Sequence, residues 1–303
     1  MKLRGPLYYS IALMPALALG VTAARGGSDV WDLEASAAPG ITDPCQAQLV
    51  SSVNIEGGGG RCGRRAGGNA TADVTYRLVI DAGHGGKDRG AQGFLGISEK
   101  YLSLEVAELL KRKVEEKARL LALAVQVKMT REEDVFQSLH DRVEMANEWP
   151  ADLFLSLHAN WSTIQKARGF EVYFLSHEAS DAEARRLVQI ENHTEEVPIK
   201  SEILSILTDV QNTKHIEDSS RLAETIFNRL SLVHTPNGRG VRQGPFTVLS
   251  GTSMPSVLIE MGFVSNPNDA KFLHNPVYLR RLADAISAGV IDFVLRNRKS
   301  QTS

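Results

Sequence analysis

This sequence has only two cysteines and almost no net charge. Its 303 residues include 34 Lys and Arg against 36 Asp and Glu, a formal net charge of −2. No basic stripe with interleaved aromatic residues accompanies this balance, so the sequence gives no support to nucleic-acid binding. The only two cysteines, Cys45 and Cys62, can form a single disulfide at most, and in an exported chain we expect a local bridge between them.

Long hydrophobic runs are absent except near the start of the chain. A basic beginning precedes a mostly apolar stretch at residues 6–21, which is shorter than the ~20 residues that a membrane span needs. Small residues follow up to Ala23, so we predict a signal peptide over residues 1–23, with a retained anchor as the alternative. Cys45 does not follow a lipoprotein-like Leu-Ala-Gly, so we expect no lipid anchor. The predicted location is the periplasm or cell envelope.

The sequence then divides by composition into a tether and one domain. Residues 24–75 are rich in Gly, Ala, Ser and Thr, with four glycines at 57–60, and are predicted to be a flexible linker. Residues 76–297 are long enough for a single domain with a substantial core. Residues 298–303 would be a short tail. No internal repeat is visible.

Strand-like and helix-like segments alternate in residues 76–297, which predicts an α/β fold. We expect a central, mostly parallel or mixed sheet with helices on both faces, and any ligand site at the carboxyl ends of the strands. Strands are predicted near residues 76–81, 122–129, 152–157, 170–174, 241–249 and 257–261. Helices are predicted near residues 99–117, 138–146, 180–190, 218–233 and 276–295.

The first predicted strand ends at a histidine between glycines. The apolar run Leu78-Val-Ile80 leads into Asp-Ala-Gly-His-Gly-Gly, with His84 as the histidine. Glycines there let the backbone turn sharply and approach a ligand closely. Taken alone, His84 could equally be a turn residue satisfied by backbone groups.

Two further residues fit the same site. Glu99 opens the helix that follows the glycine loop, where an acidic residue can also simply favour the helix dipole. His158 ends another apolar strand, and in α/β sheets ligands bind beyond the carboxyl ends of strands. Two imidazoles and one carboxylate, with the fourth position left to water, compose a hydrolytic zinc site rather than a structural one.

Glu260 supplies the remaining chemistry. It interrupts the apolar strand Val257-Leu-Ile-Glu-Met261, where a carboxylate is costly unless it is used. Burial raises the pKa of a carboxyl group and a nearby cation lowers it, so Glu260 could act as general base and then as general acid. A buried structural ion pair is the alternative.

Five motifs occur in a fixed order: Asp-Ala-Gly-His-Gly-Gly, Ser-Glu-Lys, Met-Thr-Arg, Ser-Leu-His-Ala-Asn and Ile-Glu-Met-Gly-Phe. Together they resemble the zinc-dependent N-acetylmuramoyl-L-alanine amidases of the amidase-3 type, from about residue 77 to about residue 294. The resemblance implies that His84, Glu99 and His158 hold one Zn²⁺ per chain and that Glu260 is the catalytic carboxylate. Gly244 stands where the family usually has alanine, and this departure touches none of those roles.

The activity implied by the resemblance is hydrolysis of the amide between N-acetylmuramic acid and the L-alanine of the peptidoglycan stem, in wall remodelling or daughter-cell separation. A zinc peptidase that cuts within the stem is an alternative, because the ligand set alone does not separate the two. A non-catalytic wall-binding module is a second alternative, although it should lack one of the four residues. We expect a monomer, and an envelope activator or targeting protein could be a partner.

Residues 192–201 are predicted to form an exposed loop. Its adjacent Glu195 and Glu196 could reach the open zinc position, but the loop offers little apolar surface to hold a lid closed. We therefore expect substantial activity without an activator.

Overall fold

The computed structural model describes residues 75–194 and 202–301 of the chain. The predicted signal peptide, nearly all of the predicted tether, the predicted Cys45–Cys62 bridge and the two loop glutamates, Glu195 and Glu196, lie outside these ranges. No helix among the described residues is both long and apolar enough to cross a membrane.

Six strands and six α-helices make up the described part of the chain. The strands are β1 (Tyr76–Ala82), β2 (Val125–Met129), β3 (Leu153–Asn160), β4 (Glu171–Leu175), β5 (Val241–Gly244) and β6 (Ser256–Phe263). The helices are α1 (Glu99–Leu120), α2 (Leu139–Glu148), α3 (Ala182–Glu191), α4 (Glu202–Leu230), α5 (Pro267–Leu273) and α6 (Pro276–Gln301), with short 3₁₀ turns at Phe94–Gly96 and Asn192–Thr194.

The strands form one mixed sheet in the order β2-β1-β3-β6-β4-β5. The first four strands in this order run parallel, β4 pairs antiparallel with β6, and β5 runs parallel to β4. β1, β3 and β6 are therefore adjacent and end at the same edge. This confirms the predicted α/β fold and brings the ends of the three chemistry-bearing strands together.

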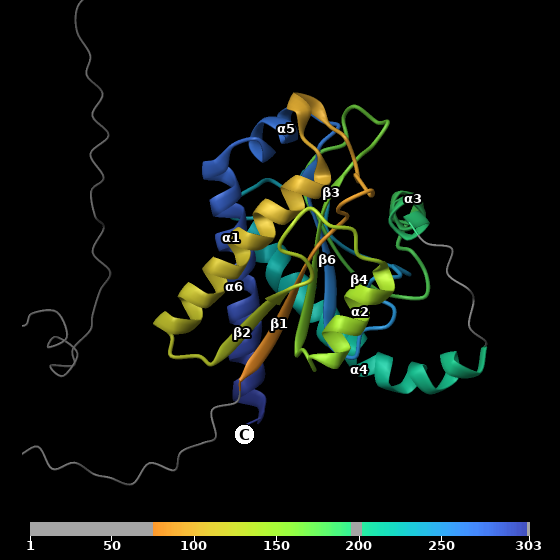
Figure 1. Ribbon diagram of the computed structural model, residues 1–303, viewed down its shortest axis with the longest axis vertical. Helices are drawn as coiled ribbons and strands as arrows, with labels where there is room; N and C mark the ends of the chain where they lie inside the picture. The colour runs from red at the N-terminus through yellow and green to blue at the C-terminus, as the bar shows by residue number, and fades with distance from the viewer. Residues whose placement is uncertain (1–74, 195–201, 302–303) are drawn as a thin grey trace, which may run out of the picture. The chain divides into compact units, whose positions relative to one another are not determined.

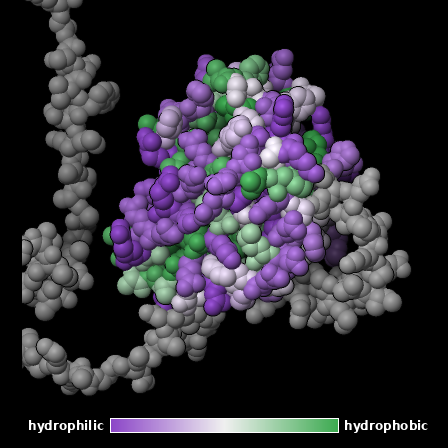
Figure 2. Space-filling model, viewed as in Figure 1, coloured by the Kyte–Doolittle hydropathy of each residue, from purple (hydrophilic) through white to green (hydrophobic). Residues whose placement is uncertain are grey.

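Helices cover both faces of the sheet (Figure 1). Helices α1, α4 and α6 pack on one face of the sheet. Val106 of α1, Leu222 of α4 and Ile286 of α6 belong to the larger core cluster on this face. Helices α2 and α3 cover the other face over a smaller cluster that includes Phe154 and Leu187. The surface seen from this side is mostly hydrophilic, with apolar residues in separate patches (Figure 2).

The period-two alternation of strand side chains decides which face carries the site. In β3, Leu155 and Leu157 join the larger cluster, whereas Phe154 joins the smaller one. His158 therefore points to the same side as Phe154, toward α2 and α3. Glu260 shares this face, because its Cα pairs with that of His158 between β3 and β6.

Several elements differ from the predicted ones. Helix α6 continues to Gln301, past the predicted end at residue 295 and into the predicted tail. Helix α4 begins at Glu202, well before residue 218, and the apolar residues Ile203, Leu204 and Leu207 already recur there at helical spacing. Strand β5 stops at Gly244, since the following Pro245 has no N–H for the ladder. Helix α5 was not predicted; Asn266 caps it by accepting hydrogen bonds from two backbone N–H groups, and Pro267 takes its first position.

Candidate metal centre

His84 follows β1 in the left-handed region, with φ of 61°, a conformation that costs a non-glycine residue roughly 1–2 kcal/mol. Gly83 makes this loop possible. A Cβ at Gly83 would lie 2.5 Å from the imidazole of His158 and 2.8 Å from the carbonyl oxygen of Leu157. The two histidine-bearing strands can approach this closely only because position 83 has no side chain.

Glu99 reaches the site from the first residue of α1. Its Oε2 accepts a hydrogen bond from the N–H of Ala91 at 2.7 Å, and its Oε1 accepts one from the N–H of Ala159 at 2.9 Å. These bonds tie the carboxylate to the glycine loop and to β3. Glu99 is thereby fixed beside both histidines, and its side chain is buried.

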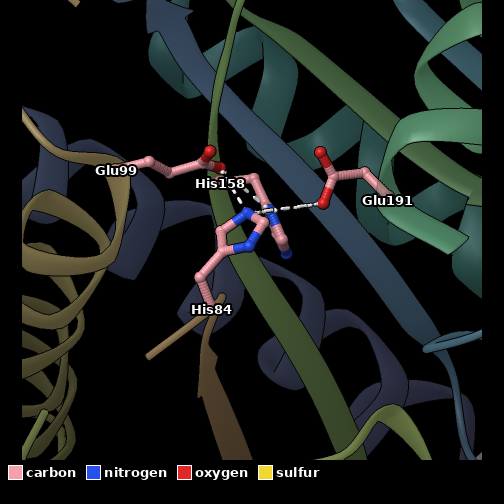
Figure 3. A group of neighbouring side chains, drawn as sticks. All are labelled: His84, Glu99, His158 and Glu191. Atoms are coloured by element: carbon pink, nitrogen blue, oxygen red, sulfur yellow. Dashed lines mark hydrogen bonds and ion pairs between the residues drawn. The ribbon is translucent and has the colours of Figure 1, made fainter. Parts of the chain in front are cut away.

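Glu191 reaches the site from the opposite side. It is the last residue of α3, and its carboxylate points to the two imidazoles across from Glu99 (Figure 3). Its Oε2 lies 3.0 Å from His158 Nδ1 and 3.5 Å from His84 Nε2. His84, Glu99, His158 and Glu191 are all buried and form a cluster whose ligand atoms lie within 4.8 Å of one another.

The separations in this cluster fit a metal ion. His84 Nε2 lies 3.1 Å from His158 Nδ1, and Glu99 Oε1 lies 3.0 Å from the former and 3.1 Å from the latter. A tetrahedral ion with bonds of about 2.0–2.2 Å separates its ligand atoms by about 3.3–3.6 Å. Five of the six separations among the four ligand atoms are 3.0–3.5 Å and the sixth is at most 4.8 Å, so small adjustments would admit the ion.

The protonation of the cluster leads to the same conclusion. Burial would lower the pKa of His158, but the carboxylates of Glu191 and Glu99 outweigh it, and the pKa rises to about 10. Burial also acts against protonation of His84, yet the charge of Glu99 raises its pKa well above the usual value. Positive charge beside the buried carboxylates of Glu99 and Glu191 therefore stabilises the cluster. A divalent cation would supply the charge that two imidazolium protons otherwise provide.

Asp88 orients the first histidine. Its Oδ2 lies 2.9 Å from His84 Nδ1, the ring nitrogen that faces away from the cluster. With the proton on Nδ1 donated to Asp88, the lone pair of Nε2 faces the metal position. Asp81, which also lies close to His84 in the sequence, accepts a hydrogen bond from Ser156 Oγ at 2.6 Å.

Glu260 is fully buried beside this cluster. Neither carboxylate oxygen has a hydrogen-bond partner among the described residues. Burial raises the pKa of Glu260 well above its usual value, and the charge of Glu191 adds to the increase while His158 opposes it. A buried carboxyl group without a hydrogen-bond partner is costly, which favours a chemical role over the structural ion pair considered from the sequence.

Polar residues after β2 hold the glycine loop and helix α2 in place. Arg131 donates to the carbonyl oxygens of Ala82 and Gly83, which brace the turn before His84. Arg142 forms a buried ion pair with Asp81 at 2.6 Å. Asp134 accepts from the N–H of Gly86 and Asn147 contacts the backbone near residue 251.

A cavity of about 690 Å³ opens beside the cluster. His84, Glu99 and Glu191 line it together with the loop at residues 87–92 and the side chains of Trp161 and Ile190. A substrate in this cavity would lie against the metal position, so the arrangement can perform metal-assisted hydrolysis.

The structure brings together all four residues singled out from the sequence, His84, Glu99, His158 and Glu260. It adds one residue that the sequence expectation did not include, because Glu191 lies in the same buried cluster as the two histidines and Glu99. The sequence held one signal for this residue: Glu191 continues the stripe of Ala184, Leu187 and Val188 at helical spacing, and all of these are buried. A carboxylate in line with an apolar stripe points inward.

Comparisons with known proteins agree with this geometry. The family model described as N-acetylmuramoyl-L-alanine amidase matches residues 78–292. N-acetylmuramoyl-L-alanine amidase AmiA of Escherichia coli (strain K12) is 36% identical over 223 residues, which are 71% of this chain and 75% of that protein. AmiC of Neisseria meningitidis is 34% identical over 256 residues, 82% of this chain and 58% of that protein.

Solved structures share the fold. The N-acetylmuramoyl-L-alanine amidase from Clostridium difficile 630 has a TM-score of 0.55 at 26% identity, covering 73% of this chain and 97% of that one. AmiC2 of Nostoc punctiforme has a TM-score of 0.54 at 28% identity, with the same coverage. The order of the five motifs, the clustered side chains and these matches agree, and the chain belongs to the amidase-3 family of N-acetylmuramoyl-L-alanine amidases.

Proposed function

We propose that this enzyme is an exported zinc amidase in which His84, Glu99 and His158 hold the metal and Glu260 is the general base and acid. As a member of its family, it hydrolyses the amide between N-acetylmuramic acid and the L-alanine of the peptidoglycan stem. The observation that carries the proposal is the convergence of two imidazole nitrogens and two carboxylates beside a cavity.

Each of the chain's own residues has a distinct part in this reaction. Zinc, when bound, polarises the amide carbonyl and makes a water molecule more acidic. Glu260 accepts the proton of the attacking water on a carboxylate oxygen and returns it to the alanine nitrogen as the C–N bond breaks. Its raised pKa suits both steps, because the group must bind and release a proton near neutral pH. Asp88 keeps His84 in the tautomer that binds the metal.

Glu191 makes the described conformation a closed one. A catalytic zinc site keeps one position open, whereas a structural site uses four protein ligands. With Glu191 as the fourth ligand, no position is left for the water or the substrate. Glu191 must therefore move away before turnover, in contrast to the open site expected from the sequence.

Helix α3 is the element that has to move. Asn192 Nδ2 donates to the carbonyl oxygen of Pro245 at 2.9 Å, and its Oδ1 accepts from the N–H of Thr247 at the same distance. Arg242 holds the other end of the helix through Asp181 at 2.7 Å. A protein activator that breaks these polar contacts would open the site. This is the role we propose for the envelope partner considered from the sequence.

The export of the chain rests on its sequence. We retain the signal peptide at residues 1–23, the linker at residues 24–75 and the catalytic domain from residue 76 as the proposed organisation; residues 298–301 of the predicted tail continue helix α6 of that domain. Cleavage of the signal peptide and location in the periplasm or envelope follow from this. Mass determination of the mature chain from a cell-envelope fraction tests the organisation, because a start near residue 24 is expected.

Digestion of purified sacculi tests the proposed reaction. With Zn²⁺, the enzyme should release stem peptides that begin with L-alanine and leave the glycan strands intact, as identified by mass spectrometry. Release of D-alanine or opening of cross-bridges would indicate a peptidase and would overturn the proposal. The Glu260→Gln variant is the matched control for contaminating hydrolases.

A further inference from the structure

One wall of the cavity beside the metal centre is cationic. Lys87 and Arg89, both exposed, come from the loop after β1, while Trp161, Leu187 and Ile190 contribute apolar side chains. The roles proposed above use neither basic residue. Loop 87–92 belongs to the part of the site fixed to the sheet, whereas Leu187 and Ile190 lie on the helix that must move.

The backbone around Arg89 is fixed against the ligands themselves. Asp88 binds His84 Nδ1 through one carboxylate oxygen and accepts from the N–H of Gly90 through the other, at 3.1 Å. A Cβ at Gly90 would lie 2.6 Å from both Glu99 Oε2 and His84 Cδ2. The carbonyl oxygen of Arg89 accepts from Gln92 Nε2 at 3.2 Å. Arg89 is thus one residue away from backbone that packs directly on two metal ligands.

The guanidinium of Arg89 is available for a ligand. It forms no ion pair with any residue in the described ranges, and the nearest acidic groups have other partners. Asp88 is occupied by His84 and Gly90, and Glu99 by Ala91 and Ala159. Lys87 is different, because its Nζ lies 4.2 Å from the ring centroid of Phe136 in a cation–π contact.

We propose that Arg89 binds a free carboxylate on the second residue of the stem peptide, next to the alanine whose amide is cut. This inference rests on the proposed function, since it places the scissile amide at the metal position. Adjacent residues are 3.8 Å apart between Cα atoms, so the second residue of a bound stem lies close to the same loop. The planar guanidinium matches a carboxylate with two parallel hydrogen bonds, a fit that favours an acidic residue over its amide.

The carboxylate must come from the peptide side. The lactyl carboxyl group of N-acetylmuramic acid is consumed in the amide bond itself, so it offers no negative charge in the substrate. Arg89 would therefore select the chemistry of the stem and fix its direction in the cavity, with the peptide over loop 87–92. The enzyme would discriminate between walls whose second stem residue is a free acid and walls in which that group is amidated.

Two matched peptides test this selection by binding. Both are N-acetylmuramoyl tripeptides with an amidated third residue, and in both the second residue is a glutamate linked through its γ-carboxyl group. They differ only in the α-carboxyl group of this glutamate, which is a free acid in one peptide and an amide in the other. Dissociation constants are measured by calorimetry on the zinc-loaded full chain carrying Glu260→Gln, which prevents turnover. Closure by Glu191 weakens both peptides equally, so it cancels in the ratio.

We expect the free acid to bind about tenfold more tightly than the amide, and Arg89→Gln to reduce this ratio to within about twofold. Arg112→Gln, an equal change of charge about 20 Å along α1 from Glu99, should leave the ratio unchanged. Lys87→Gln should also keep the preference for the free acid, and change the ratio of the two dissociation constants by no more than about twofold.

Three results would overturn the assignment: an unchanged preference in Arg89→Gln, a preference that depends on Lys87 instead, and equal or no binding of both peptides. Sacculus digestion by the unmodified enzyme separates this failure from failure of the proposed function. If that assay releases stem peptides, the amidase function stands even when the peptide-binding results exclude the proposed role of Arg89.

Discussion

Glu191 Oε2 lies 3.0 Å from His158 Nδ1, on the side of the two imidazoles opposite Glu99 (Figure 3). This contact joins the end of a peripheral helix to the end of a central strand. In the proposed zinc site this carboxylate would add a fourth protein ligand to the other three, so access of water would depend on whether α3 is docked.

Removing the fourth carboxylate should activate the enzyme. We expect Glu191→Ala to raise the rate of sacculus cleavage about tenfold, which corresponds to a closed conformer favoured by about 1.4 kcal/mol. Zinc content should stay near one per chain, because three protein ligands suffice for a catalytic site. Dye release from labelled sacculi and metal analysis measure the two effects. Glu178→Ala, an exposed acidic residue preceding α3, is the control; equal rates in both variants would exclude the closed-site interpretation.

Replacing the proposed acid and base should separate chemistry from metal binding. Glu260→Gln keeps the size of the side chain but cannot accept a proton from water. We expect the rate to fall about 10²–10⁴-fold, with zinc content unchanged. Single-turnover cleavage of sacculi with parallel metal analysis is the measurement. Activity within twofold of the parent enzyme would remove Glu260 from the mechanism.

Asp88 should control metal affinity through His84. Asp88→Asn removes the charged acceptor of the Nδ1 proton, and loss of such a partner typically weakens metal binding about 10–100-fold. Competition with a chelator gives the zinc dissociation constant directly. His84→Ala should abolish both zinc binding and activity, and serves as the lower limit. An affinity equal to that of the parent enzyme would show that the 2.9 Å contact does not orient the ligand.

The buried Asp81–Arg142 pair should make stability depend on acid. Burial would raise the pKa of Asp81, but the charge of Arg142 and hydrogen bonds from Ser156 and Thr130 outweigh it and lower the pKa. A lowered folded-state pKa means that the pair stabilises the protein above the unfolded-state value of about 3.9. The contribution is lost as the pH falls from there through the folded-state pKa.

Asp81→Asn should accordingly destabilise the enzyme by about 3–5 kcal/mol at pH 7, because Arg142 is left buried without its partner. Urea unfolding between pH 7 and pH 3 measures this, and the difference from the parent enzyme should shrink below about pH 3.9. Asp284→Asn breaks the more exposed pair with Lys117 and should cost less than about 1 kcal/mol. A difference that is independent of pH would contradict the argument.

The domain boundary predicts that residues before Thr75 are dispensable for chemistry. A protein beginning at Thr75 contains every strand and helix of the described sheet and all the site residues. We expect its rate of sacculus cleavage to stay within about threefold of the longer chain, since transition-state contacts are unchanged. Cys45 and Cys62 are absent from this protein, so their bridge would be irrelevant to activity. Insolubility or loss of activity would show that the preceding segment supports the domain.

Local patterns in the sequence determined much of this protein. Alternating apolar runs and helical stripes predicted the α/β sheet, and two strands that end on His84 and His158 marked its functional edge. Glu99 was evident because it opens the helix after the glycine loop. Glu260 was evident because a carboxylate inside an apolar strand is costly. Each of these signals lies within a short segment, where neighbouring residues set the conformation and burial of one another.

Only the tertiary structure decided what closes the site. Glu191 reaches the two histidines because α3 packs its apolar stripe on the face of β3 that carries His158, and no local pattern specifies that docking. The same holds for the two aspartates that flank His84 in the sequence: Asp88 contacts the His84 imidazole, whereas Asp81 pairs with Arg142. Strand order β6-β4-β5 likewise depends on long-range pairing. Contacts between distant segments depend on how whole faces fit together, because burial and charge pairing are satisfied only after the layers assemble.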